Sequence, residues 1–257
     1  MKSWIKAFVI ITYIAMIAVN ALANIIPING ITTGEVSNLY ENLFTPSSIT
    51  FSIWGVIYFL LALFTLYQAG LFRNNDKHAK LLNNIGILFS ISSIANMLWI
   101  FAWHYKVLSL SVILMTIILI SLIFIVTKIK NTNLNSKEKF FISIPFSIYF
   151  GWITVATIAN ITAFLVKINW DRFGLSEIFW AITIIIIGAI IGIITIIKNK
   201  DYVYGAVIIW AYIGILIKHL SENGFDRVYP SVIITVIISI IIVLIVNIFV
   251  FLKLIKH

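Results

Sequence analysis

Residues 231–254 read SVIITVIISIIIVLIVNIFVFLKL, an apolar stretch in which Lys253 is the one charged residue. A helix that crosses a bilayer needs about 20 consecutive apolar residues. A strand in lipid would leave its backbone groups unpaired unless it closed into a barrel, and this stretch lacks the alternation of polar and apolar residues that barrel strands show. The stretch therefore predicts a transmembrane helix.

The same kind of segment recurs along the whole chain. Hydrophobic residues make up 61% of the 257 residues and charged residues 11%, whereas soluble domains are roughly 45–50% apolar and about 25% charged. We therefore predict an all-α, polytopic membrane protein embedded in a lipid bilayer. The eight predicted spans are residues 5–24, 47–70, 81–104, 107–128, 139–165, 175–197, 202–220 and 231–254.

The basic residues predict how these spans are oriented. The chain carries a net charge of +9, which on a soluble protein could indicate nucleic-acid binding. Here the basic residues lie between apolar spans, so we expect no nucleic-acid partner. With the N-terminus inside, 13 of the 18 Lys and Arg residues, Lys256 among them, fall on the inner side and five on the outer side. The positive-inside rule then places both termini in the cytoplasm, in a cell membrane.

The connection at residues 25–45 is the longest loop, and it contains no basic residue. We expect it to be external and to cover a site, as long loops in compact folds often do. Its end, Thr45-Pro46, is typical of a helix N-cap followed by proline at the first helical position. The first span also resembles a cleaved signal peptide, with Lys2 and Lys6 before an apolar run and Ala21-Leu22-Ala23 after it.

A change in composition divides the chain in two. From residue 168 onward the spans are rich in isoleucine and poor in polar residues, so we expect one unit at residues 1–167 and an added three-helix segment at residues 168–257. Gly188 and Gly192 form a G-x-x-x-G pair, which lets another helix approach closely. Packing within this chain explains the pair better than dimerisation does, although a homodimer stays open.

The sequence offers little for catalysis. No Asp or Glu lies in the middle of a span, and there is no cysteine, paired carboxylate, metal-binding motif, P-loop or nucleophile triad. We therefore expect no enzyme, no cofactor and no metal site. His104 and His219 lie at span ends, where a haem-ligating role competes with the better reading, a solvated histidine at the interface.

Three spans carry aromatic and amide side chains on one face. Trp54 and Tyr58 are four residues apart, and the other two spans show similar helical spacing. A buried amide in lipid needs a partner, so these faces are expected to converge on a ligand pocket, with helix packing as the alternative. Trp4, Trp103, Trp170 and Trp180 are read as interfacial anchors. The candidate ligand-binding residues are Trp54, Tyr58, Asn96, Trp99, Tyr149, Trp152 and Asn160.

Several of these residues resemble motifs of the TspO/translocator-protein family, the tryptophan-rich sensory proteins. Residues 45–58, TPSSITFSIWGVIY, are similar to the family pattern P-P-x-W-V-F-x-x-x-W-x-x-x-Y and match it at Pro46, Trp54 and Tyr58. Residues 96–99 resemble the N-x-x-W of its third helix. Residues 149–160 resemble the Y-x-x-W and later asparagine of its fifth helix. Thr45 and Ser48 depart from the signature.

The resemblance implies a five-helix bundle, here with about three additional helices, and a pocket beneath the first loop. It also implies a small hydrophobic partner, a porphyrin in many members. Together with the polar faces, it favours a membrane receptor or sensor that binds a small aromatic ligand. The alternative is a small-molecule transporter or a permease component, which the added helices would suit.

Overall fold

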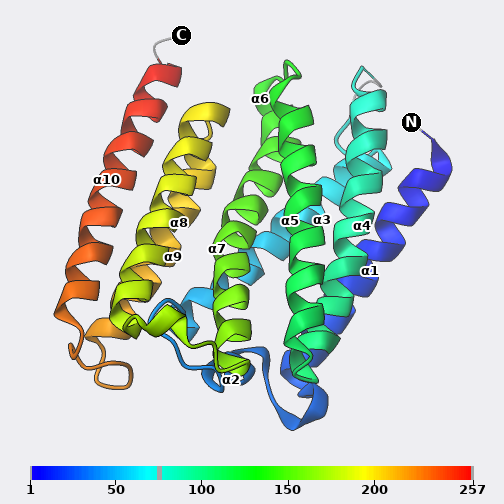
Figure 1. Ribbon diagram of the computed structural model, residues 1–257. Coiled ribbons are helices and arrows are strands. Elements are labelled where there is room, and N and C mark those ends of the chain that lie inside the picture. The colour runs from blue at the N-terminus through cyan, green and yellow to red at the C-terminus, as the bar shows by residue number, and fades with distance from the viewer. Residues whose placement is uncertain (1, 74–76, 256–257) are drawn as a thin grey trace. The chain divides into compact units, whose positions relative to one another are not determined.

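The computed structural model describes residues 2–73 and 77–255, and its regular elements there are all helical. Within this part of the chain, eight helical segments of 19 to 32 residues are long and apolar enough to cross a membrane. The chain is thus an all-α, multi-pass membrane protein, as predicted. Lys256, which entered the charge count, lies outside the described residues. The spans, seen in Figure 1, are Ser3–Ile25, Ser48–Ala69, Ala79–His104, Leu108–Lys130, Ser136–Lys167, Glu177–Asn199, Tyr202–Leu220 and Pro230–Ile255.

Most spans are single helices with ends close to the predicted ones. They are α1 (Ser3–Ile25), α4 (Ala79–His104), α5 (Leu108–Lys130), α8 (Glu177–Asn199), α9 (Tyr202–Leu220) and α10 (Pro230–Ile255). The second span joins the short helix η2 (Ser48–Ser52) to α3 (Ile53–Ala69).

The fifth span contains a wide turn. It runs through α6 (Ser136–Glu138), the π-helical η3 (Lys139–Ser143) and α7 (Ile144–Lys167). Pro145 explains the wide turn, because proline has no N–H to donate and its ring clashes with the carbonyl four residues earlier.

The chain divides into two compact units. Unit 1 comprises Met1–Val36 and Trp54–Ile153, and unit 2 comprises Ser37–Ile53 and Thr154–His257. α7 therefore contributes its first part to unit 1 and its second part to unit 2. The separation at residue 167 predicted from composition concerns which part can fold alone, and it stays a prediction.

Unit 1 is a helical bundle centred on α4, which packs against α1 and α5 (Figure 1). A triad of buried phenylalanines joins α3, α4 and the first part of α7. The ring centroids of Phe64 and Phe146 are 4.7 Å apart, and those of Phe64 and Phe89 are 5.5 Å apart, both in edge-to-face contact. Edge-to-face aromatic pairs each contribute about 0.5–1.5 kcal/mol beyond the area they bury.

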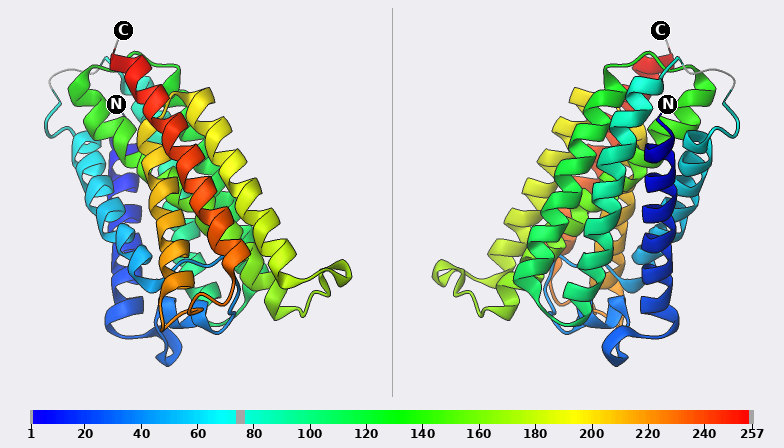
Figure 2. Two further views of the ribbon diagram at one scale, coloured as in Figure 1. Left: turned by 90° about the vertical axis from the view of Figure 1, so that its left-hand side faces the viewer. Right: turned by 90° about the vertical axis from the view of Figure 1, so that its right-hand side faces the viewer.

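Unit 2 contains the three-helix group of α8, α9 and α10, which lie side by side in Figure 2. The G-x-x-x-G pair faces α9 within this group. A Cβ added at Gly188 would lie 2.6 Å from the Tyr212 hydroxyl, and one added at Gly192 would lie 3.3 Å from Ile208. The glycines therefore serve packing within the chain, the reading that the sequence favoured over dimerisation.

The long loop contains two short helices, η1 (Ile28–Gly30) and α2 (Thr33–Asn38). Glu35 accepts hydrogen bonds from the backbone N–H and the hydroxyl of Thr32, both at 2.7 Å. These bonds stabilise the carboxylate and hold the pKa of Glu35 below its usual value. The loop is thus an ordered segment with its own capped helix.

The predicted cap at Thr45-Pro46 is wrong. The first helical turn of the second span begins at Ser48, after Ser47 in an extended conformation. The Thr45 hydroxyl instead donates to the Asn42 side chain at 3.0 Å, and Asn42 in turn accepts from the backbone N–H groups of Phe44 and Thr45. A local asparagine turn therefore uses the side chain that was expected to cap the helix.

Candidate functional site

An aromatic cluster in unit 1 brings four of the predicted residues together. Trp54 and Tyr58, one turn apart on α3, stack with their ring centroids 5.2 Å apart. Trp54 also makes edge contacts with two rings of α7, Tyr149 at 6.0 Å and Trp152 at 6.2 Å. Tyr149 and Trp152 are almost fully buried. The indole of Trp54 is therefore the centre of the cluster, because it contacts all three of the other rings.

A chain of hydrogen bonds continues from this cluster to α1 and α4. The Tyr58 hydroxyl donates to the Asn20 side-chain oxygen at 2.6 Å, and the Asn20 amide donates to the Asn96 side-chain oxygen at 2.6 Å. The Asn96 amide nitrogen and the Tyr149 hydroxyl, both buried, have no hydrogen-bond partner among the described residues. Asn96 is completely buried and Asn20 is 6% exposed, so the Asn20 amide is paired inside an apolar bundle, whereas the Asn96 amide nitrogen is a further buried donor without an acceptor there.

Asn20 is the residue of this network that was not predicted. It lies in the first span, where Tyr13, two turns earlier, is the one aromatic residue on the same face. The signal available was its amide, since an asparagine within an apolar span needs a partner on a neighbouring helix.

Trp99 lies on α4, one turn beyond Asn96. Its ring stacks on that of Trp103, with centroids 5.5 Å apart. The Trp103 indole N–H donates to the Thr33 carbonyl at 3.1 Å, whereas the buried Trp99 indole N–H has no acceptor among the described residues. Because buried polar groups are usually paired, this unsatisfied donor is a candidate contact for a ligand.

Six of the seven predicted residues thus lie in unit 1, and four of them form the ring cluster. Asn96 belongs to the amide network and Trp99 to the neighbouring indole pair. Asn160 is buried, but it lies in the part of α7 that belongs to unit 2. Their assignment to a ligand site stays a prediction.

Two histidines differ from what the sequence suggested. His104 and His219 are fully buried rather than solvated. The Nδ1 of His104 lies 3.0 Å from the Ile28 carbonyl, and its Nε2 lies 3.0 Å from the Thr33 hydroxyl. With both nitrogens engaged, His104 fastens the first part of the long loop to the end of α4.

His219 has a similar role within unit 2. Its Nε2 is 2.9 Å from the Leu43 carbonyl. The Ser47 N–H donates to the Gly214 carbonyl at 3.0 Å, and the Trp210 indole donates to the Thr50 carbonyl at 3.1 Å. α9 therefore contacts the end of the long loop at Leu43 and the start of the second span at Ser47 and Thr50.

The aromatic cluster combines flat apolar rings, packed against one another, with the neutral donors and acceptors of the neighbouring amides and hydroxyls. Among the described residues, no group of three or more His, Asp or Glu side chains is placed to hold a metal ion. The arrangement suits an uncharged, planar part of a ligand.

The comparisons with known proteins agree with this architecture. No curated protein and no solved structure shows a significant similarity to the chain. A family model does match, and it covers residues 6–250, which includes all eight spans nearly to their ends. The match thus extends over both units and over the segment that composition marked as an addition. On this evidence the chain belongs to the family of TSPO-like proteins.

Proposed function

We propose that this protein is a membrane receptor that binds a small, flat, hydrophobic ligand of porphyrin type at the aromatic cluster of unit 1. The observation that carries the proposal is the arrangement around Trp54, where three further rings lie within 6.2 Å by centroid distance. Stacking on such rings is the usual way in which proteins hold a planar aromatic ligand.

The neighbouring polar groups support orientation of the ligand. The Tyr58–Asn20–Asn96 chain fixes the amides in place, and the Trp99 indole N–H offers a donor that no described residue uses. A ligand with one hydrogen-bond acceptor at its edge would satisfy that donor. The rings contact one another directly, so such a ligand would replace ring–ring contacts by ring–ligand contacts of similar strength, and apolar burial would drive binding.

The family adds support of a coarser kind. Membership in the TSPO-like proteins is consistent with the resemblance at Pro46, Trp54 and Tyr58, and two of these three side chains belong to the cluster. The four rings of the cluster belong to two tryptophans and two tyrosines, with no carboxylate, histidine or cysteine among them. Binding, with sensing as its output, is therefore the function that we propose.

The test is a titration of protoporphyrin IX into the full-length protein in nanodiscs, followed by tryptophan quenching. Trp54→Leu and Trp152→Leu should each weaken the affinity about fivefold or more, since an aromatic contact contributes about 0.5–1.5 kcal/mol beyond buried area. Trp4→Leu is the matched control, because Trp4 is 57% exposed at the start of α1.

Two results would contradict the proposal. One is unchanged affinity in both cluster variants when thermal unfolding shows them to be folded. The other is an equal loss in Trp4→Leu, which would indicate partitioning into lipid. Saturable uptake of the porphyrin into proteoliposomes would identify transport as the output instead of sensing.

A further inference from the structure

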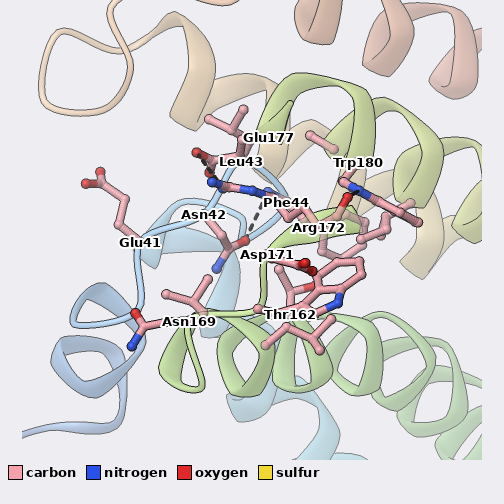
Figure 3. A pocket seen from close by; sticks show the side chains of 15 residues that line it. Glu41, Asn42, Leu43, Phe44, Thr162, Asn169, Asp171, Arg172, Glu177 and Trp180 are labelled. Carbon is pink, nitrogen blue, oxygen red and sulfur yellow. Dashed lines mark hydrogen bonds and ion pairs between the residues drawn. The ribbon is translucent and has the colours of Figure 1, made fainter. Parts of the chain in front are cut away.

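Unit 2 contains a pocket that none of the predicted site residues lines. Its volume is about 440 Å³, within the range of roughly 300–1,000 Å³ typical of small-molecule sites. Its walls are residues 41–44 of the long loop, the last turns of α7, the connection that follows α7 and the first turns of α8 (Figure 3). The pocket therefore lies at the ends of two spans, the part of a membrane protein that is expected near the membrane–water interface.

Two indoles form its aromatic wall. The ring centroids of Trp170 and Trp180 are 4.9 Å apart, with an angle of 59° between the rings. The Trp180 indole N–H donates to the Arg172 carbonyl at 2.8 Å, which fixes that ring (Figure 3). Arg172, Phe173 and Gly174 have φ of 59°, 54° and 73°. Three successive left-handed residues turn the chain sharply, and this turn brings the two tryptophans together.

The charged residues of the lining are mostly acidic. They are Glu41, Asp171 and Glu177, against one guanidinium, that of Arg172. These three are a third of the nine acidic residues in a chain whose net charge is +9. The pocket is thus a locally negative place on a basic protein, which attracts cations and repels anions.

The three carboxylates differ in whether other groups of the protein already pair with them. Glu177 lies 3.7 Å from Arg172, and both side chains are 46% exposed, so solvent screens this pair. Glu41 is at the rim with its carboxylate turned away from the other labelled side chains (Figure 3). One oxygen of Asp171 accepts from the Phe173 N–H at 3.0 Å, which leaves its other oxygen for a ligand.

We propose that this pocket binds an organic ammonium cation, with its charge beside Asp171 and its alkyl groups against the indoles of Trp170 and Trp180. Indole faces attract a desolvated cation through their quadrupole, and they provide the apolar contact that a hydrated metal ion cannot use. A soluble amine and the ammonium headgroup of a lipid share this chemistry. The site is separate from the aromatic cluster of unit 1 and does not depend on the function proposed there.

The test uses benzyltrimethylammonium as the probe and titrates it into the full-length protein in nanodiscs by isothermal calorimetry. Its uncharged analogue, in which carbon replaces nitrogen, controls for hydrophobic partitioning. Asp171→Asn is the informative variant, because asparagine keeps the hydrogen bond to Phe173 and removes the charge. Glu222→Gln is the matched control, since it removes an acidic side chain from unit 2 outside the pocket lining.

We expect Asp171→Asn and Trp170→Leu each to weaken the affinity for the probe about fivefold or more. Glu222→Gln should leave that affinity unchanged, and binding of the uncharged analogue should not saturate. Equal binding by wild type and Asp171→Asn, saturation by the analogue, or no saturable binding of the probe would overturn the proposal. Porphyrin affinity should be the same in Asp171→Asn as in wild type. The proposal for this pocket and the proposal for the aromatic cluster can therefore be refuted independently of each other.

The source of the ammonium group is distinguished by the lipid. In nanodiscs of phosphatidylcholine the headgroup would compete, so the probe should bind more weakly than in nanodiscs of an uncharged glycosyl diacylglycerol if a lipid is the natural occupant; an anionic lipid is avoided because its surface attracts the probe by itself. Equal affinity in the two lipids would assign the pocket to a soluble amine.

Discussion

At the scale of single residues, the Asn20 amide connects three helices of unit 1. Its oxygen accepts from Tyr58, and its nitrogen donates to Asn96 and to the Met16 carbonyl at 2.9 Å. One side chain of α1 thus joins α3 and α4. Hydrogen bonds between membrane helices contribute about 0.6 kcal/mol on average and up to about 1.7 kcal/mol, so a residue that makes two of them has a measurable effect.

Asn20→Val should lower the stability of the protein by about 1–3 kcal/mol, because it leaves the Tyr58 hydroxyl and the Asn96 oxygen buried without their partner. Thermal unfolding in detergent measures the effect. Asn24→Val is the control, since Asn24 lies one turn later and donates to the Asn20 carbonyl of its own helix. A melting temperature equal to that of the control would show that the network does not hold the helices together.

The sequence predicts many of these residues as candidate site residues, but it does not predict which side chains they contact. Helical spacing predicted that Trp54 and Tyr58 share a face, and the rings do stack. It could not predict that Asn20 joins them, because hydrogen bonds between helices depend on how the helices pack. Trp170 and Trp180 were read as separate interfacial anchors for the same reason: their contact depends on the left-handed turn at residues 172–174.

At the scale of elements, a hydrogen bond over a glycine joins α8 to α9 in unit 2. The Tyr212 hydroxyl donates to the Ile185 carbonyl at 2.6 Å, and the missing side chain of Gly188 makes room for it. The contact explains why a glycine lies in the middle of a membrane helix, where its backbone entropy is otherwise unfavourable by about 0.5–1 kcal/mol relative to alanine.

Gly188→Ala should destabilise the protein by about 1–3 kcal/mol, because the added methyl group must displace Tyr212 or separate the helices. Gly55→Ala is the matched control on α3. A Cβ there meets no atom within 4 Å, so alanine should instead stabilise the protein by about 0.5–1 kcal/mol. Opposite shifts in melting temperature are expected, and equal shifts would refute the packing role of Gly188.

The elements themselves were the most predictable part of the fold. Apolar length alone located eight spans, because lipid requires every backbone group to be paired within a helix. The details inside the connections were less accessible. Thr45-Pro46 has the residues of a helix start, yet the Thr45 hydroxyl donates to Asn42 and the helix begins at Ser48, two residues after the predicted first position.

At the scale of the whole molecule, the family match includes the last three spans, which composition marked as an addition. Composition separates residues 168–257 from the rest, because these spans are rich in isoleucine. The family model nevertheless continues to residue 250, so these spans belong to the same family pattern as the first five. The isoleucine content of a helix reflects how much of its surface faces lipid. It therefore does not show whether that helix belongs to the same family pattern as its neighbours.

The charges predict how this molecule is oriented in the membrane. Eight crossings would place both termini on the same side, and 13 of the 18 basic residues favour the cytoplasm for that side. We expect the turn between α5 and α6, at residues 131–135, on that side too. Lys128, Lys130 and Lys137 flank it, close enough to the span ends for the rule to act.

Reporters placed at the C-terminus and in the turn at residues 131–135 should therefore both read cytoplasmic, and one placed between α7 and α8 should read external. The turn reports on the first four spans and the C-terminus on all eight. A cytoplasmic turn with an external C-terminus would mean that one of the last four helices does not cross the membrane. Two external readings would mean that the five basic residues of the opposite loops outweigh the 13, which the positive-inside rule does not allow.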